Sequence, residues 1–278
     1  MIKAMLILLS PAKTLDFETA LPPINLSQPA LEDQALPLIK RARELSPSSL
    51  ASLMGISDKL AQLNAERFKA WQPGAGHPVA RPAILAFNGD VYEGLAATSL
   101  DAQDITWAQD RLRMLSGLYG VLRPLDALQP YRLEMGTRLS NPRGQDLYSY
   151  WGHRVTQALN QDLARLAARG EPTLTVNLAS EEYFKVVCRN DRPVNDQDVP
   201  SEGLQGQLVS PVFQDAKGSG DFKIVSFYAK RARGLMARYI VQNRLTKVAD
   251  LEGFDLEGYR FDPSVSTVER PVFRRRQG

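Results

Sequence analysis

The sequence predicts an α/β (α+β) protein in which helices surround a mixed β-sheet. Short apolar runs typical of buried strands alternate with helical patterns along the chain, and are not gathered into separate halves. The 278 residues are 44% hydrophobic and 23% charged, which is typical of a globular protein with a large core. No internal repeat or clean linker divides the chain. We therefore expect residues 1–278 to form one large domain, or two closely packed lobes, with a basic tail at 263–278.

The first half of the chain alternates apolar runs with helical spacings. Residues 5–9 are continuously apolar, which predicts a strand buried on both faces. Residues 30–45 have the apolar spacing of a helix. Two short helical patterns flank a tight turn within 50–68. A second buried strand is predicted at 83–87 and a helix at 99–115.

The second half continues the same alternation. Residues 147–168 predict a helix and 174–178 a strand, after which Ser180 is placed as the N-cap of a further helix. Short strands are predicted at 209–213 and 222–226. The second of these leads directly into a long helix.

Few residues of the kinds that hold metals are present. The single cysteine, Cys188, excludes a disulfide framework and the usual multi-cysteine metal sites, and its apolar neighbours predict burial. The two histidines, His77 and His153, are not in a paired spacing. We expect no metal site and no cofactor.

The apolar runs also bear on location. None approaches the roughly 18 residues that a membrane helix needs, and residues 4–9 are too short for the core of a signal peptide. We expect a cytoplasmic monomer with no membrane partner.

Polar side chains follow the first predicted strand. Ser10, Lys13 and Thr14 come directly after its carboxyl end, where ligand sites of open α/β sheets gather. The alternative is a plain turn with a solvated lysine.

The tight turn within residues 50–68 contains Gly55, Ile56 and Ser57, and Lys59 opens the second helix. This order resembles a helix-hairpin-helix motif, whose backbone N–H groups point at a DNA phosphate. That motif usually has a second glycine where this chain has Ser57. The alternative is an ordinary helical hairpin with Ser57 as N-cap.

The strongest charge feature lies at residues 223–247, although the whole chain has only 34 basic against 31 acidic residues, a formal charge of +3. The helical angles place an apolar face opposite a basic face, within which Gly234 and Ala237 would let a phosphate approach closely. An ordinary solvated face would contain glutamates, and none is present. The stretch therefore predicts an anion-binding face, and its seven basic residues are Lys223, Lys230, Arg231, Arg233, Arg238, Arg244 and Lys247.

Several sequence blocks resemble the YaaA family of peroxide stress resistance proteins, over residues 5–262. They are Ser-Pro-Ala-Lys-Thr at 10–14, Phe-Asn-Gly-Asp-Val-Tyr at 87–92, Leu-Ser-Gly-Leu-Tyr-Gly at 115–120 with Arg-Pro-Leu-Asp at 123–126, Pro-Tyr-Arg-Leu-Glu-Met-Gly at 130–136, Asn-Leu-Ala-Ser at 177–180 with Tyr-Phe-Lys at 183–185, and Phe-Tyr-Ala-Lys-Arg-Ala-Arg-Gly at 227–234.

The resemblance implies a cytosolic bacterial protein of the peroxide stress response, which lowers intracellular free iron and so limits Fenton damage to DNA. It further implies binding of double-stranded DNA, regular, distorted or damaged, through a positively charged cleft and a helix-hairpin-helix element. The DNA-binding candidates in this sequence are Gly55, Ile56, Ser57, Lys59, Lys230, Arg231, Arg233 and Arg238. The cleft candidates are Ser10, Lys13, Arg123, Arg132, Lys185 and Lys230.

Two other function classes stay open. The chain could be an enzyme acting on a phosphorylated or nucleic-acid substrate, because mixed carboxylates and amines in one cleft can perform acid/base chemistry. That requires Lys13, Asp90 and Lys230 to lie within about 15 Å of one another. The catalytic candidates are Lys13, Asp90, Asp126 and Lys185. A scaffold acting through the basic tail is the third class. With one cysteine and two histidines the chain is poorly equipped to sequester iron, so its effect on iron is expected to be indirect.

Overall fold

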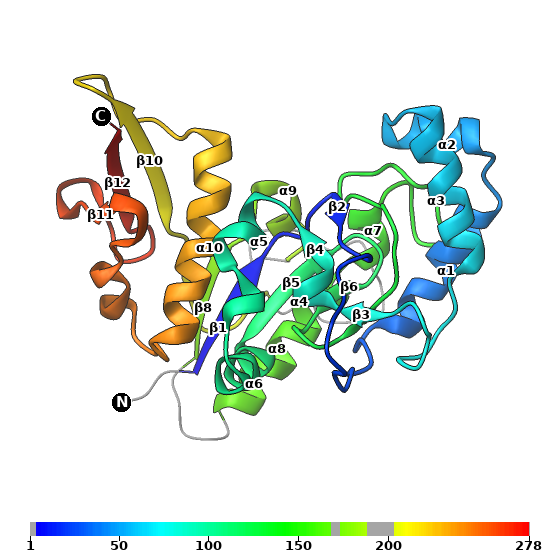
Figure 1. Cartoon of the computed structure of the whole chain (residues 1–278), viewed down its shortest axis with the longest axis horizontal. Helices are drawn as coiled ribbons and strands as arrows, with labels where there is room; N and C mark the ends of the chain where they lie inside the picture. The colour runs from blue at the N-terminus through cyan, green and yellow to red at the C-terminus, as the bar shows by residue number, and fades with distance from the viewer. Residues whose placement is uncertain (1–3, 168–172, 188–202, 278) are drawn as a thin grey trace.

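A five-stranded sheet forms the centre of the computed structural model, which describes residues 4–167, 173–187 and 203–277 (Figure 1). The strand order is β6-β5-β1-β8-β9, and all neighbours are parallel except β5 and β6. Because β1 lies in the middle, Met5 to Leu9 are completely buried, as the apolar run predicts. The strands are β1 (Ala4–Leu9), β5 (Leu112–Ser116), β6 (Gly120–Leu122), β8 (Thr173–Leu178) and β9 (Gln207–Val209).

A smaller three-stranded sheet, in the order β10-β12-β11, lies at one end of the molecule (Figure 1). Three helices, α1 to α3, lie at the other end. The mixed sheets and surrounding helices confirm the α/β class. The strands are β10 (Val212–Lys217), β11 (Arg260–Phe261) and β12 (Val272–Gln277), and the helices α1 (Glu32–Arg43), α2 (Pro47–Met54) and α3 (Asp58–Ala70).

The remaining helices and two-residue strands complete the fold. Two pairs of antiparallel two-residue strands, β2 with β4 and β3 with β7, border the helical end. No helix of the described residues has the length and apolarity to cross a membrane. The elements are β2 (Thr14–Leu15), β3 (Arg81–Pro82), α4 (Ala83–Ala86), β4 (Phe87–Asn88), α5 (Asp90–Leu95), η1 (Ala97–Ser99), α6 (Ala102–Arg111), β7 (Ala127–Leu128), α7 (Leu147–Trp151), α8 (Arg154–Ala167), α9 (Glu181–Phe184), α10 (Ser226–Gln242), η2 (Val248–Gly253), η3 (Leu256–Gly258) and η4 (Pro263–Val265).

Helix α10 packs against α5 on one side and against β10 on the other. At Gly234 the α5 backbone is so near that an added Cβ would lie 1.8 Å from the carbonyl oxygen of Val91. At Gly94 of α5 an added Cβ would lie 2.3 Å from the Arg231 carbonyl oxygen. The expectation that Gly234 and Ala237 leave room for a phosphate was therefore wrong, because both residues are buried between helices.

Several predicted element boundaries were wrong for identifiable reasons. The predicted strand at 83–87 is α4 followed by β4, since a short apolar run does not distinguish a buried helical turn from a strand. The helix predicted at 99–115 ends at Arg111, and the next residues form β5. Residues 209–213 contribute to β9 and β10, which belong to different sheets. Residues 222–225 make only an isolated bridge, from Lys223 to Asp215, and Ser226 already begins α10.

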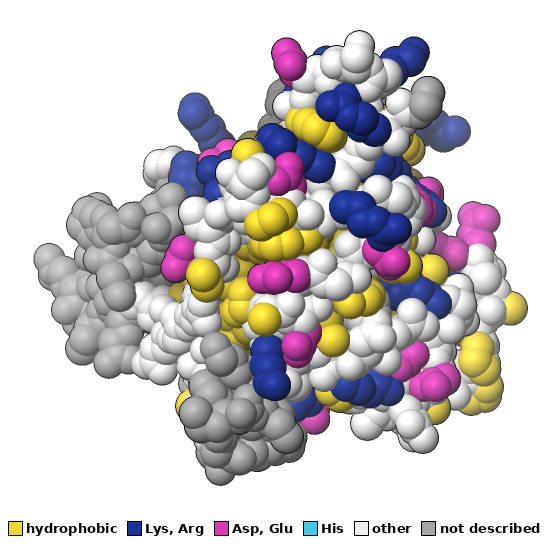
Figure 2. All heavy atoms as spheres, turned by 90° about the vertical axis from the view of Figure 1, so that its left-hand side faces the viewer, with side chains coloured by type: hydrophobic (Ala, Val, Ile, Leu, Met, Phe, Trp, Pro, Cys, Tyr) yellow, Lys and Arg dark blue, Asp and Glu magenta, His cyan; other side chains and the backbone are white. Residues whose placement is uncertain are grey.

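The predicted basic tail at 263–278 is folded over residues 263–277. β12 is the middle strand of the small sheet, and its arginines have partners in neighbouring elements. Arg274 pairs with Asp262 at 2.7 Å and Arg275 with Asp215 at 2.7 Å. Figure 2, which views the molecule from this end, shows basic and acidic side chains interspersed. The arginine run at 274–276 therefore belongs to a packed strand and not to a free tail.

Candidate functional site

A cavity of about 330 Å³ opens at the carboxyl ends of β1 and β8, between the start of α5 and helix α10. These parallel strands are neighbours in the sheet, so the residues that follow them meet at one edge. Polar and charged side chains from four parts of the chain line this pocket. They include Ser10, Lys13, Asp90, Glu182, Lys230 and Arg233.

Hydrogen bonds from two elements hold Ser10 at the floor of the pocket. The Tyr92 hydroxyl donates to the Ser10 carbonyl oxygen at 2.9 Å. The backbone N–H of Ser180 donates to Ser10 Oγ at 2.8 Å, and the Ser10 hydroxyl donates back to Ser180 Oγ at 3.2 Å. The side chains that end β1 and β8 are thus fixed relative to each other.

Lys13 lies at the edge of the pocket and shares one carboxylate with Arg132. Lys13 Nζ is 2.7 Å from Glu134 Oε2, and Arg132 Nη2 is 3.1 Å from Glu134 Oε1. The Lys13 side chain is 64% exposed, so water screens this ion pair strongly. Lys13 can therefore exchange Glu134 for another anion at little cost in stability.

Lys230 and Arg233 line the pocket from α10, and neither forms an ion pair or side-chain hydrogen bond with another residue that the structure describes. Lys230 is exposed, whereas Arg233 is partly buried. Burial lowers the pKa of the Arg233 guanidinium. A partly desolvated cation without a counter-charge favours an anion beside it. These two side chains are therefore placed to bind an anion in the pocket.

Two carboxylates complete the lining. Asp90 begins α5, and Glu182 lies on α9. Glu182 Oε1 accepts a hydrogen bond from the Gly136 N–H at 3.1 Å. Three cations and two carboxylates therefore line one pocket. The cations can bind an anionic group of a ligand, and the carboxylates can accept hydrogen bonds from donor groups of the same ligand.

The other basic candidates of α10 have partners within the protein. Arg231 donates two hydrogen bonds to Glu257 Oε1, from Nη2 at 2.6 Å and from Nε at 2.8 Å. Arg231 Nε also lies 3.1 Å from Glu257 Oε2. The hydrogen bonds with Glu257 raise the pKa of Arg231. Arg238 donates to the carbonyl oxygens of Leu95 and Ala96, both at 3.1 Å. The basic stretch contains no acid, but the acids come from elsewhere in the chain.

Three further candidates lie outside this pocket lining. Asp126 is fully buried and pairs with Arg123 at 2.9 Å, while the Ser27 hydroxyl donates to it at 2.7 Å. Burial raises the pKa of Asp126, although hydrogen bonds from Arg123 and Ser27 act in the opposite direction. Lys185 Nζ lies 4.8 Å from the ring centre of Tyr148. Arg123, Asp126 and Lys185 therefore do not meet Lys13 and Asp90 in this pocket.

Helices α2 and α3 form a helical hairpin, and Ser57 is the N-cap of the second helix. Gly55 ends α2 in the left-handed region at φ 60°, and Ser57 Oγ accepts a hydrogen bond from the Leu60 N–H at 3.4 Å as the N-cap of α3. Gly55, Ser57 and Lys59 are exposed. In Figure 1 the hairpin and α10 lie toward opposite ends of the molecule. A ligand that contacts both must be an extended one.

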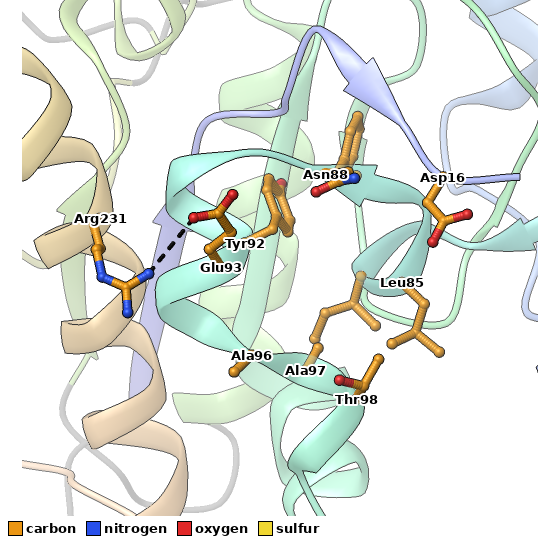
Figure 3. Close-up of a pocket in the computed structure, with 11 residues that line it drawn as sticks. Asp16, Leu85, Asn88, Tyr92, Glu93, Ala96, Ala97, Thr98 and Arg231 are labelled. Atoms are coloured by element: carbon orange, nitrogen blue, oxygen red, sulfur yellow. Dashed lines mark ion pairs between the residues drawn. The ribbon is translucent and has the colours of Figure 1, made fainter. Parts of the chain in front are cut away.

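A second cavity, of about 430 Å³, lies beside the first and shares Asn88 with it (Figure 3). Arg231 reaches from α10 toward Glu93 of α5, with 3.7 Å between Arg231 Nη1 and Glu93 Oε2. Asp16 lies across the cavity from this ion pair. Nothing in the sequence spacing of Asp16, Asn88 and Glu93 brings these residues together, so the sequence does not predict this cavity.

Asp16 makes stability dependent on pH. Hydrogen bonds from the Thr19 side chain and from the N–H groups of Thr19 and Glu18 lower its pKa from 3.8 to about 2. A lowered folded-state pKa stabilises the fold above the unfolded value, and this contribution disappears as pH falls from about 4 to about 2. We expect the wild type to lose more stability between pH 5 and pH 2.5 than Asp16→Asn, as measured by urea unfolding. Asp221→Asn, at an exposed carboxylate, is the control and should behave as the wild type; an identical loss in Asp16→Asn would contradict the prediction.

The sequence rule that selected Ser10 would also have found Ser180, since each residue follows the carboxyl end of a parallel strand. Glu182 could not be found in this way, because its place in the pocket depends on the direction of α9. The prediction that Cys188 is buried falls outside the described residues. Within those residues, no group of three or more His, Cys, Asp and Glu side chains could hold a metal ion.

A comparison with models of known protein families matches most of the chain. The model of the peroxide stress protein YaaA family matches residues 5–265. This range includes every block on which the resemblance rests, and also the two strands and the three helices that border the pocket. The match covers well over half of the chain, so the chain belongs to the family of the peroxide stress protein YaaA, whose members act in peroxide stress resistance.

Proposed function

We propose that this peroxide stress protein binds double-stranded DNA through its pocket cations and its helical hairpin, and that it helps to limit iron-driven damage to DNA by lowering intracellular free iron. The observation that supports the proposal is that Lys230 and Arg233 line one pocket and neither forms an ion pair with a described residue. DNA phosphates are polyanionic and attract such cations strongly. Lys13, whose ion pair is largely exposed, adds a third cation at the pocket edge.

The hairpin supplies a second contact with different chemistry. The backbone N–H groups of Ser57, Asp58 and Lys59 lie at the N-terminus of α3, and the Lys59 side chain adds a positive charge there. Backbone N–H groups at a helix start can bind a phosphate without reading the base sequence. Because the hairpin and α10 are separated along the molecule, a duplex suits both contacts better than a small ligand. We therefore expect binding that depends on salt and is independent of sequence.

A salt titration of duplex binding tests this proposal. We expect Lys230→Glu combined with Arg233→Glu to weaken binding at least 10-fold and to lower the salt slope by about 2, since each phosphate contact contributes about one unit. Lys59→Glu is expected to weaken binding less. Gel shifts with regular, bulged and single-stranded DNA measure these effects and rank the DNA forms.

The control makes the same change of charge elsewhere. Lys217 and Arg270 are exposed and their side chains have no ionic partner among the described residues, so Lys217→Glu with Arg270→Glu should retain wild-type binding. Circular dichroism verifies that each variant is folded. Equal binding by the wild type and the pocket double variant would overturn the proposal.

Enzymatic activity is a second candidate function, favoured by one observation. Lys13, Asp90 and Lys230 line the same pocket, as a joint acid/base site requires. Such a site would act on a phosphorylated or nucleic-acid substrate. The DNA recovered from the binding reactions, examined for cleavage or altered ends, distinguishes turnover from binding alone.

A further inference from the structure

We infer that the pocket at the ends of β1 and β8 recognises a phosphate monoester, held between Arg233, Lys230 and the Ser180 hydroxyl. A terminal phosphate of a DNA strand and the phosphate of a free nucleotide or sugar share this chemistry. The inference rests on the proposed function, because the same cations serve both, but it makes a narrower claim about what enters the pocket.

The two α10 cations of the pocket match a monoester better than a diester. A phosphate monoester carries a charge of about −1.5 to −2 at neutral pH, whereas each internal phosphate of DNA carries one negative charge. Lys230 and Arg233 together supply two positive charges, and neither forms an ion pair with a described residue, although Asp90 and Glu182 line the same pocket. They are three residues apart on α10, so their side chains are neighbours on the helix surface.

The shape of the pocket favours the end of a chain. An internal phosphate is flanked by a nucleotide on each side, and both must leave the cavity along the surface. A terminal phosphate has one substituent and can enter alone. The cavity of about 330 Å³ has the size of a small-molecule site, and it is lined from β1, α5, α9 and α10.

Arg233 is the side chain that most requires such a ligand. It is partly buried, which makes its charge costly, and burial lowers its pKa. A guanidinium binds two phosphate oxygens at once through parallel N–H groups. Lys230, which is exposed, serves as a mobile second cation.

The two serines supply an oriented donor. Ser180 N–H donates to Ser10 Oγ, and the Ser10 hydroxyl donates to Ser180 Oγ. The proton of Ser180 is therefore left to donate to a ligand. Tyr92 fixes the backbone of Ser10 from below, so this pair is held in place before a ligand arrives.

The two carboxylates of the pocket favour a ligand that carries hydrogen-bond donors beside its phosphate. Asp90 and Glu182 repel a second anion but accept hydrogen bonds from hydroxyl or amino groups. A phosphate attached to a sugar presents such groups, whereas inorganic phosphate does not. We therefore expect a sugar phosphate to bind more tightly than inorganic phosphate.

Calorimetric titration of the full-length protein tests the free ligands. We expect adenosine 5′-monophosphate and ribose 5-phosphate to bind at least 10-fold more tightly than adenosine or inorganic phosphate. Arg233→Gln should remove this preference, and Arg270→Gln, which removes a charge at an exposed position, should keep it. Arg233→Lys should retain part of the binding, because it restores the charge without the bidentate geometry.

DNA substrates separate this inference from the proposed function. We expect duplexes with 5′- or 3′-phosphate ends to bind at least 10-fold more tightly than duplexes with hydroxyl ends, and Arg233→Gln to abolish the difference. Covalently closed circular DNA has no ends and measures DNA binding alone.

Each outcome decides one claim. Equal binding of phosphorylated and hydroxyl ends, with no preference among the free ligands, would overturn the inference, while binding of circular DNA would leave the proposed function intact. Tight binding of free monoesters with no binding of any DNA would support the inference and overturn the proposed function. A preference for phosphorylated ends without binding of free monoesters would identify the strand end as the ligand.

Discussion

Gly234→Ala is expected to destabilise the protein by about 3 kcal/mol or more, the upper range for overpacking. The new Cβ would lie 1.8 Å from the Val91 carbonyl oxygen and 2.8 Å from the Leu95 backbone nitrogen. Backbone atoms cannot rotate away as a side chain does, so α5 and α10 must separate. Urea unfolding measures the loss.

The same substitution should also alter the pocket, since α5 contributes Asp90 and α10 contributes Lys230 and Arg233. We expect weaker DNA binding even at temperatures where the variant is folded. Gly76→Ala is the matched control: nothing lies within 4 Å of its Cβ, and its φ lies outside the left-handed region. It should change stability by less than about 0.5 kcal/mol. A loss below 1 kcal/mol for Gly234→Ala would contradict the close approach of the helices.

Arg113→Met is expected to cost about 3 kcal/mol, the lower end of the range for removing one partner of a buried ion pair, because its partner Asp162 is 23% exposed. Arg113 lies in β5 and its side chain is 1% exposed. Its Nε is 2.6 Å from Asp162 Oδ2 on α8. Its remaining N–H groups donate to backbone carbonyls at the end of α6, including those of Gln109 and Asp110.

This arginine therefore satisfies helix carbonyls that have no intrahelical partner, and it joins α6 to α8 beneath the sheet. Arg165→Met is the matched control, because Arg165 also pairs with Asp162 but is 43% exposed. Exposed pairs contribute about 0–1 kcal/mol, so the control should lose no more than that. Similar losses for the two variants in urea unfolding would show that burial is not the cause.

The boundaries of elements show where sequence patterns stop being decisive. Residues 5–9 have only one stable place, since a run of five apolar side chains must be buried on both faces of a sheet. Leu112 and Leu115 fit the predicted helix equally well, but they lie in β5, because pairing with β1 completes the sheet. The competing interaction joins residues about a hundred positions apart, and a local pattern cannot contain it.

The sequence by itself determined the α/β class, the family, the long helix at α10 and the loop that places Ser10 and Lys13 at a strand end. Tertiary structure decided which cations are free. Arg231 and Arg238 were indistinguishable from Lys230 and Arg233 in the basic stretch, yet the first two are held by Glu257 and by the α5–η1 backbone. Charge is a property of a residue, but its availability depends on counter-charges and backbone carbonyls that only folding brings near.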